Sequence, residues 1–261
     1  MTRAMPESTS SGAPRAALVT GSARRIGRAI ALALADAGYA VALHANRSRD
    51  EAEGLAADIR GKGGRALAVV ADLADPVAVQ GLVPATAALG PLTLLVNNAG
   101  EFEFDDIATL TRARFDRTLA VNLAAPLFLA QAFAAQAPEG AGASIVNILD
   151  QRVLKPTPRF FSYGLSKSAL HGATVTLAQA LAPKVRVNAV APGPTLPSPR
   201  QTDAEFAAQA AALPLRKGPG PGDIAAAVLY LAQANGVTGV TLPVDGGQHI
   251  AWRTPDSDIA E

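Results

Sequence analysis

Three residues in the middle of the chain carry side chains that can transfer a proton together. Tyr163 and Lys167 are four residues apart, so on a helix the phenol and the ammonium group lie on one face. A cation this close favours the phenolate, and we expect Lys167 to lower the pKa of Tyr163 toward a range useful for proton transfer. Asp150 lies upstream of this pair, at the end of an apolar run. These residue types and spacings predict an acid–base site.

Short apolar runs alternate with amphipathic stretches along nearly the whole chain. The expected strands are residues 16–20, 40–44, 65–71, 92–97, 144–149, 185–190 and 240–244. The expected helices are 26–37, 50–60, one that starts at Asp75-Pro76, 112–136, 163–181, 203–212 and 223–233. Continuous apolar strands separated by helices indicate a parallel sheet covered on both faces. We therefore expect one α/β domain over residues 15–261.

Composition narrows the possible partners. The chain has 261 residues, is 49% hydrophobic and carries a net charge of +1, which is enough apolar material for one domain with a core. The near-neutral charge gives no argument for nucleic acid or membrane partners. The absence of cysteine excludes disulfides and makes a reducing compartment the default. Because His44, His171 and His249 are scattered, no metal site is expected.

Two segments fall outside the regular alternation. Residues 1–14 have no apolar core, so we expect a disordered leader and no secretion signal. Charge and proline break the alanine-rich runs before they reach the spanning length of about 20 residues, and a cytoplasmic protein is expected. Residues 192–221 hold seven prolines around a short alanine-rich helix. A segment of this kind between a strand and a helix favours a lid over the substrate rather than a domain boundary.

Two loops contain glycine and asparagine at positions typical of nucleotide binding. Gly21 permits a tight turn after the first expected strand, and Gly27 lets helix and strand approach closely. The helix that follows offers its N-terminal N–H groups to a pyrophosphate. Asn98, Ala99 and Gly100 follow the fourth expected strand. Taken alone, the first segment is also compatible with an ordinary βα loop and the second with a simple turn.

Together with Tyr163 and Lys167, these segments resemble the short-chain dehydrogenase/reductase family over about residues 15–250. Asn122, Pro192-Gly193 and the Val-Asp-Gly-Gly run at 244–247 extend the resemblance. It implies a Rossmann-type, doubly wound parallel sheet of seven strands in the order 3-2-1-4-5-6-7. It also implies a nicotinamide cofactor, a small-molecule substrate and a homotetramer built on the helices over 112–136 and 163–181. The alanines on those helices would permit two helices of different subunits to approach closely. The simpler interpretation is that these alanines only pack against the sheet.

The resemblance implies a role for each matched residue. Tyr163 would donate the proton, Lys167 would hold the nicotinamide ribose and perturb Tyr163, and Asn122 would connect Lys167 to a water relay. The cofactor-binding residues implied are Gly21, Arg25, Ile26, Gly27, His44, Asn46, Arg47, Ser48, Asp72, Leu73, Asn98, Ala99, Gly100, Tyr163, Lys167, Pro192 and Gly193.

Two departures point to a subgroup. Arg25 stands where the family usually has a third glycine, and Asp150 stands where it usually has a serine that binds a substrate carbonyl. Both changes occur together in the pteridine reductases and the related dihydromonapterin/dihydrofolate reductases. In that group a His-x-x-Arg-Ser pattern, here His44, Arg47 and Ser48, holds the NADPH phosphate. The resemblance thus implies Arg25, Asp150, Tyr163 and Phe102 as substrate-binding residues, with Phe102 stacking on a pterin.

Simpler interpretations compete with these roles. Arg25 can be a solvated cation, although a cation at a helix N-terminus is mildly unfavourable without an anionic partner. Arg47 can be a surface charge, but this strand end lacks the acid that would bind a ribose 2′-OH and instead suits a 2′-phosphate. Phe102 fits core or lid packing nearly as well as substrate stacking. Asp150 can be a surface-loop acid, which its spacing to Tyr163 disfavours.

The function expected from these residues is NADPH-dependent reduction of a pterin-like C=N bond. In that reaction Asp150 would orient Tyr163 or a water molecule and help to protonate a ring nitrogen. One alternative is a carbonyl reductase that acts on a ketone, an acyl thioester or a sugar. Another is a nucleotide-binding protein without turnover, which the Tyr163–Lys167 pair argues against, because a pure binder needs no tuned phenol.

Overall fold

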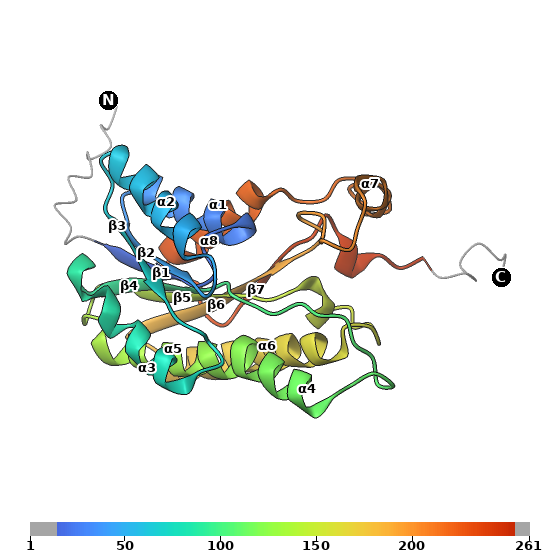
Figure 1. Cartoon of the computed structure of the whole chain (residues 1–261), viewed down its shortest axis with the longest axis horizontal. Helices are drawn as coiled ribbons and strands as arrows, with labels where there is room; N and C mark the ends of the chain where they lie inside the picture. Colours follow the sequence, from blue (N-terminus) through green and yellow to red (C-terminus); the bar gives the residue numbers. More distant parts are fainter. Residues whose placement is uncertain (1–14, 254–261) are drawn as a thin grey trace, which may run out of the picture.

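A seven-stranded parallel sheet forms the centre of the computed structural model, which describes residues 15–253 (Figure 1). The strand order is β3-β2-β1-β4-β5-β6-β7, so the expected doubly wound topology is confirmed. The strands are β1 (Ala16–Val19), β2 (Ala40–Ala45), β3 (Ala66–Val70), β4 (Leu92–Asn97), β5 (Ala143–Ile148), β6 (Val185–Pro192) and β7 (Thr241–Val244). The leader expected over residues 1–14 lies outside the described residues.

Helices cover both faces of the sheet, with α1, α2 and α8 on one side and α3, α4, α5 and α6 on the other (Figure 1). Helix α7 lies to one side of these layers, within the proline-rich segment that follows β6. The helices are α1 (Arg25–Asp36), α2 (Arg49–Gly61), α3 (Pro76–Leu82), α4 (Arg112–Leu119), α5 (Ala125–Gln136), α6 (Phe161–Leu181), α7 (Asp203–Ala211) and α8 (Pro221–Gln233).

The central strands are mostly apolar on both faces, because both faces of the sheet are buried. In β1, Leu18 belongs to the core cluster beneath α3 and α5, while its neighbour Val19 belongs to the cluster beneath α1 and α8. Both side chains are fully buried. Successive residues of a strand point to opposite faces, so one short apolar run supplies two separate cores. This explains why the strands show no alternation of apolar and polar residues.

One expectation about apolar runs is wrong. The continuous helical stretch Arg112–Gln136 contains a window of mean hydropathy 1.6, long and apolar enough to cross a membrane by length and composition. In this window 44% of the residues are buried inside the fold. Leu129 and Phe133 are fully buried in the core, so packing on the sheet accounts for this apolar character. The stretch is also interrupted by a π-helical turn at Ala120–Ala124, which the sequence did not predict.

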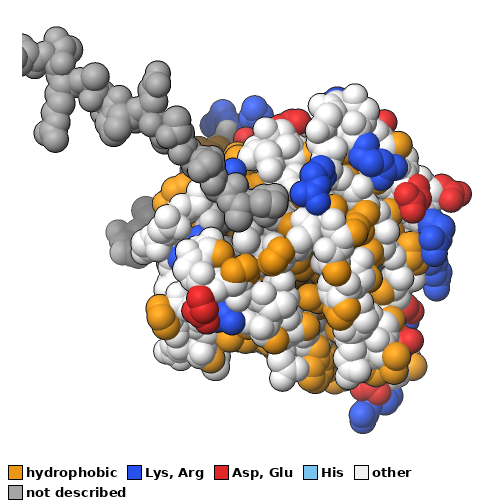
Figure 2. All heavy atoms as spheres, turned by 90° about the vertical axis from the view of Figure 1, so that its left-hand side faces the viewer, with side chains coloured by type: hydrophobic (Ala, Val, Ile, Leu, Met, Phe, Trp, Pro, Cys, Tyr) orange, Lys and Arg blue, Asp and Glu red, His pale blue; other side chains and the backbone are white. Residues whose placement is uncertain are grey.

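Charges of both signs are mixed on the side of the molecule that lies at the left in Figure 1 (Figure 2). On this face the Lys and Arg side chains lie near Asp and Glu side chains, mainly around the rim. Apolar groups between them are spread among polar atoms. This distribution agrees with a chain whose net charge is +1.

Helix α6, which carries Tyr163 and Lys167, starts on a carboxyl group from another loop. Its N-cap residue Phe160 has a φ of +57° and makes no capping side-chain bond. Instead, Asp105 accepts a hydrogen bond from the Ser162 backbone N–H at 3.1 Å and another from the Ser162 hydroxyl. Asp105 is 0% exposed and comes from the loop after β4. The start of α6 is therefore fixed to the end of a neighbouring strand.

The cap predicts a loss of stability when it is removed. Asp105→Ala leaves the Ser162 N–H and hydroxyl buried without an acceptor, so we expect the free energy of unfolding to fall by about 1–3 kcal/mol. Asp105→Asn keeps one oxygen as an acceptor for the Ser162 N–H group, so its free energy of unfolding should fall clearly less. Urea unfolding of the three proteins measures these differences. An alanine variant as stable as the wild type would contradict the capping role.

Candidate active site

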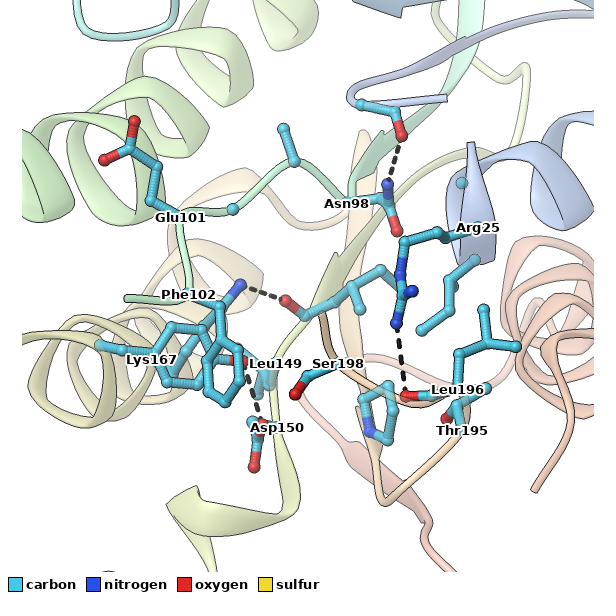
Figure 3. A pocket seen from close by; sticks show the side chains of 18 of the residues that line it. Arg25, Asn98, Glu101, Phe102, Leu149, Asp150, Lys167, Thr195, Leu196 and Ser198 are labelled. Atoms are coloured by element: carbon cyan, nitrogen blue, oxygen red, sulfur yellow. Dashed lines mark hydrogen bonds between the residues drawn. The ribbon is translucent and has the colours of Figure 1, made fainter. Parts of the chain in front are cut away.

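A cavity of about 720 Å³ opens at the carboxyl ends of the strands, where the strand order reverses around β1 and β4 (Figure 3). This is the usual ligand position in doubly wound sheets. Among the residues selected from the sequence, those that line the cavity are Gly21, Arg25, Ile26, Gly27, His44, Asn46, Asp72, Leu73, Asn98, Ala99, Gly100, Phe102, Asp150, Tyr163, Lys167, Pro192 and Gly193. Arg47, Ser48 and Asn122 are not part of this lining.

Two glycines allow the loop after β1 to pack closely against its surroundings. Gly21 has a φ of +63°, and a Cβ atom there would lie 2.9 Å from the backbone of Ala99. A Cβ atom on Gly27 would lie 2.2 Å from the carbonyl oxygen of Gly21. No side chain fits at either place, so both glycines serve the close approach that their positions in the sequence indicated.

Asn98 joins this loop to the end of β4. Its side-chain amide donates to the carbonyl oxygens of Thr20 at 2.8 Å and Gly21 at 3.0 Å. Figure 3 shows one of these two bonds. The Thr20 hydroxyl accepts in return from the Ala99 backbone N–H at 3.0 Å. The two loops that the sequence selected are thus held together by direct hydrogen bonds.

His44 supports the same loop in its neutral form. Its Nδ1 accepts from the Gly21 backbone N–H at 3.1 Å, so the ring proton resides on Nε2, which donates to the Ala71 carbonyl at 3.1 Å. Burial of the imidazole lowers the pKa of His44, which keeps the ring neutral. The side chain lines the cavity, but its two bonds give it a structural role in the loop.

The start of α1 is suited to an anion. The helix has no side-chain cap and no acidic residue in its first turn, and the residues at its start line the cavity. The N–H groups at a helix N-terminus have no partner within the helix and can bind an anion. Arg25 has a φ of +53°, which explains why the family usually has glycine at this position. Its guanidinium reaches across the cavity and donates to the Leu196 carbonyl at 3.3 Å (Figure 3).

Arg24 also lines the cavity, although sequence reasoning did not select it. It forms an ion pair with Glu51 at the start of α2. Arg47 is exposed next to Asn46. The hydrogen bond from the Ala74 backbone N–H is the main cause that lowers the pKa of Asp72, which lines the cavity, and the charge of Arg47 adds a smaller contribution. Ser48 directly precedes α2. The adjacent arginines at 24 and 25 were the sequence signal for a second cation here.

The three residues selected for proton transfer are brought together. The Tyr163 hydroxyl donates to Asp150 Oδ2 at 3.0 Å, and Lys167 Nζ donates to the Ile148 carbonyl at 2.7 Å (Figure 3). Tyr163 and Lys167 are both buried in the first two turns of α6. Asp150 and Ile148 belong to the end of β5 and the residues just after it. Strand and helix therefore meet at two points one helical turn apart.

The expected effect of Lys167 on Tyr163 is wrong for the protein alone. Burial is the largest cause that raises the pKa of Tyr163 well above its usual value, and the charge of Asp150 raises it further. Arg152 is the cation that lowers it, whereas Lys167 Nζ lies 5.9 Å from the phenol ring centroid. Burial lowers the pKa of Lys167 itself to about 8. The tyrosine is thus a protonated acid at neutral pH.

Asn122 lies behind the cavity, in the π-helical turn. Its side-chain oxygen accepts from the Glu101 backbone N–H at 2.8 Å, and its amide donates to the Glu101 carbonyl at 3.0 Å. The amide also donates to the Ser166 hydroxyl at 3.0 Å. Asn122 therefore ties the loop after β4 to α6, and its part in a water relay stays a prediction.

Phe102 belongs to an aromatic wall that includes a residue missed in the sequence. Its ring stacks on Phe160 with centroids 4.3 Å apart and meets the ring of Tyr163 edge-on at 4.7 Å. Two guanidinium groups, from Arg152 and Arg200, lie beside this pair. Phe160, Arg152 and Arg200 all line the cavity. No spacing in the sequence pairs these residues, because they come from three different loops.

The proline-rich segment contributes one side of the cavity. Pro194, Thr195, Leu196, Ser198 and Arg200 line it, together with residues of α7. Arg200 donates to the Phe102 carbonyl at 2.7 Å and pairs with Glu103 at 3.2 Å. With the bond from Arg25 to Leu196, these contacts connect the segment to two other loops. The position of the proline-rich segment beside the cavity agrees with a lid. Movement of this segment stays a prediction.

Comparisons with known proteins agree with this fold and site. A family model described as short chain dehydrogenase matches residues 15–207. FolM alternative dihydrofolate reductase 1 from Brucella canis, complexed with NADP, superposes with a TM-score of 0.90 at 50% identity, covering 94% of this chain and 97% of that one. A short chain dehydrogenase from Burkholderia cenocepacia in complex with NADP superposes with a TM-score of 0.83 at 37% identity, covering 90% and 97%.

A ketone-directed relative is also similar. The 3-oxoacyl-acyl-carrier-protein reductase FabG from Staphylococcus aureus is 32% identical over 244 residues, which cover 90% of this chain and 98% of the relative. The sheet order and the cavity define a dinucleotide-binding α/β oxidoreductase. The chain belongs to the short-chain dehydrogenase family.

The lowered pKa of Lys167 predicts the alkaline limit of activity. A depressed pKa means that the cation is lost as pH rises through about 8, well below the usual range of a lysine. If the reaction needs the charged ammonium, kcat/KM should be constant below this pH and fall above it, since kcat/KM reports the free enzyme. A profile of kcat/KM for NADPH between pH 6 and 10 measures the limb, because this ratio reports the protein before the cofactor binds. A rate that stays flat to pH 10 would show that the charge of Lys167 is not required.

Proposed function

We propose that the protein is an NADPH-dependent reductase of a pterin-like C=N bond. The observation that carries the proposal is the bond from the Tyr163 hydroxyl to Asp150, a carboxyl group in the place of the family's usual serine. The similarity to the Brucella FolM enzyme at 50% identity supports the same substrate class. Membership of the short-chain dehydrogenase family, an oxidoreductase family, is established independently of this proposal.

The residues around the cavity fit a phosphorylated dinucleotide. The uncapped start of α1 and Arg25 would hold the pyrophosphate, while Arg24, Asn46 and Arg47 would surround the 2′-phosphate. Gly193 lines the cavity and packs closely against the end of β7, since a Cβ atom there would lie 2.7 Å from the backbone of Asp245. The bound cofactor would supply the hydride.

The chain's own groups would handle the proton. Tyr163 keeps its phenolic proton at neutral pH because burial and Asp150 raise its pKa, so it is suited to donate to a ring nitrogen. Asp150, which accepts the hydrogen bond of this hydroxyl, would orient it for the transfer. Lys167, held by the Ile148 carbonyl, would bind the nicotinamide ribose. The aromatic wall of Phe102 and Phe160 would exclude water and face a flat heterocycle.

A general carbonyl reductase is the second candidate. The similarity to FabG favours it, because that relative is named as a reductase of 3-oxoacyl groups. NADPH oxidation measured with dihydrobiopterin, dihydrofolate and a panel of ketones separates the two functions. Turnover of a ketone alone would contradict the pterin proposal, and no turnover with any compound would favour a nucleotide-binding protein without activity.

Substitution of Asp150 tests the pterin proposal directly. Asp150→Asn keeps the shape and removes the ionisable group, so pterin reduction should fall about 10²–10⁴-fold, the usual range for general acid–base catalysis. Asp150→Ser should also lose pterin reduction and gain at most weak ketone reduction. NADPH affinity should change little in either variant. Near-wild-type rates in Asp150→Asn would return the chain to the carbonyl reductases.

Cofactor preference is a separate prediction. A charged contact to the 2′-phosphate contributes about 1.5–3 kcal/mol, so NADPH should bind about ten- to a hundredfold more tightly than NADH. Arg47→Ala should shrink this difference, and Arg24→Ala tests the second cation. Arg49→Ala, an exposed arginine outside the cavity lining, is the matched control. Equal affinities for both cofactors in the wild type would contradict the prediction.

A homotetramer is proposed for the assembly. Ala125 and Ala178 pack into the core, which agrees with the simpler interpretation of the alanines on these helices. However, α5 and α6 also carry large apolar residues that are exposed, namely Phe128, Leu165 and Val175. We expect light scattering at micromolar concentration to give the mass of a tetramer. Phe128→Asp should reduce the mass, whereas Val77→Asp on α3, a residue even more exposed to solvent, should not. A monomeric wild type would refute the proposal.

A further inference from the structure

The carboxyl group of Asp150 is held at both oxygens by the same residue. Oδ1 accepts from the Arg152 backbone N–H at 2.8 Å, and Oδ2 accepts from the Arg152 guanidinium at 2.9 Å. Oδ2 also accepts from the Tyr163 hydroxyl. The orientation of the carboxyl group toward Tyr163 is therefore set by Arg152 from the opposite side.

Local backbone structure brings this pair together. Asp150 is the N-cap of a short 3-10 turn, Gln151–Val153, so the residue two positions on places its N–H against the carboxyl group. The side chains of Arg152 and Asp150 are 23% and 15% exposed. An ion pair with this degree of burial is screened less by water and salt than a surface pair.

The same guanidinium touches the aromatic wall. The Arg152 carbon between the two terminal nitrogens lies 5.4 Å from the Phe102 centroid and 5.3 Å from the Phe160 centroid. Nearly equal distances to two stacked rings place the group beside the stack rather than over one outer face. Arg152 thus contacts both the proton-transfer pair and the wall expected to face the substrate.

Charge links Arg152 to the proton-transfer groups. Asp150 raises the pKa values of both Tyr163 and Lys167, while Arg152 lowers the pKa of Tyr163. Both charged groups lie in the turn after β5, and both titratable groups lie on α6. Removing the Arg152 cation would leave the Asp150 charge less neutralised, so both pKa values would move upward.

We propose that Arg152 is a positioning residue for the reaction, which holds the Asp150 carboxyl group against the Tyr163 hydroxyl and joins this pair to the Phe102–Phe160 wall. The inference rests on the proposed function for the identity of the substrate. The positioning role requires no contact between Arg152 and the substrate.

The experiment compares Arg152→Ala, Arg152→Gln and Arg152→Lys in the full-length protein. For Ala and Gln we expect kcat/KM with dihydrobiopterin to fall about ten- to a hundredfold, the change that corresponds to one charge-assisted hydrogen bond. The alkaline limb of the pH–rate profile should move above that of the wild type. Lysine keeps the charge and should restore part of the rate and the original limb. The dissociation constant of NADPH should stay unchanged in all three.

Arg159→Ala is the matched control, because this exposed arginine follows on the same loop and does not line the cavity. It should behave as the wild type. Wild-type rates in Arg152→Ala would overturn the inference. Equal losses of kcat/KM in all three variants, with the alkaline limb of the pH–rate profile unmoved, would also overturn it. Loss of folded protein in all three would do the same, because both results describe a purely structural residue. If the wild type reduces only ketones, the proposed function fails, and Arg152 is judged by the same criteria on ketone reduction.

Discussion

The hydrogen bond from Tyr163 to Asp150 fixes the geometry on which the rest of the site depends. It joins the first turn of α6 to the residue just beyond β5, and one turn further along Lys167 bonds to the carbonyl of Ile148 on the same strand. The Lys167 bond is buried and the Tyr163 bond is partly buried. Away from water a hydrogen bond is electrostatically stronger and an unpaired polar group is more costly. The helix can therefore neither rotate nor slide along the strand without breaking one of them. Asp105 adds a third fixed point at the helix start.

The cofactor side of the cavity depends on a steric constraint instead. Gly27 must lie against the carbonyl of Gly21, and Asn98 must reach the same carbonyl, before the N-terminus of α1 faces the cavity. The neutral ring of His44 holds the Gly21 N–H from the far side. Each of these residues acts on the backbone of one loop, so the anion-binding geometry is set by packing and needs no charged side chain. In the proposed cofactor complex, the arginines would add selectivity for the 2′-phosphate to a site whose shape already exists.

Sequence patterns predicted this architecture because buried strands and glycine turns obey local rules. The strand order followed from the family resemblance. Tyr163, Lys167 and Asp150, which the sequence selected together, do line the same cavity. The pKa of Tyr163 was misjudged because helical spacing reports that Lys167 is near but says nothing about burial, which is the larger effect here. Phe160 and Arg200 were missed because their contacts with Phe102 join loops that are far apart in the chain. Long-range contacts of this kind leave no periodic signal.

The chemistry of Asp150 also bears on the choice between an imine and a ketone. A serine hydroxyl can donate a hydrogen bond to a carbonyl oxygen, whereas Asp150 accepts at both of its oxygens, from Arg152 and Tyr163. A ketone oxygen placed here would meet one donor, the Tyr163 hydroxyl, beside an acceptor that repels it. A heterocycle that carries an N–H group next to its C=N bond would offer a donor to the carboxyl group and an acceptor to the phenol. A site built for a polar contact discriminates strongly against a ligand that leaves it unmatched, and the arrangement is consistent with the proposed nitrogen substrate.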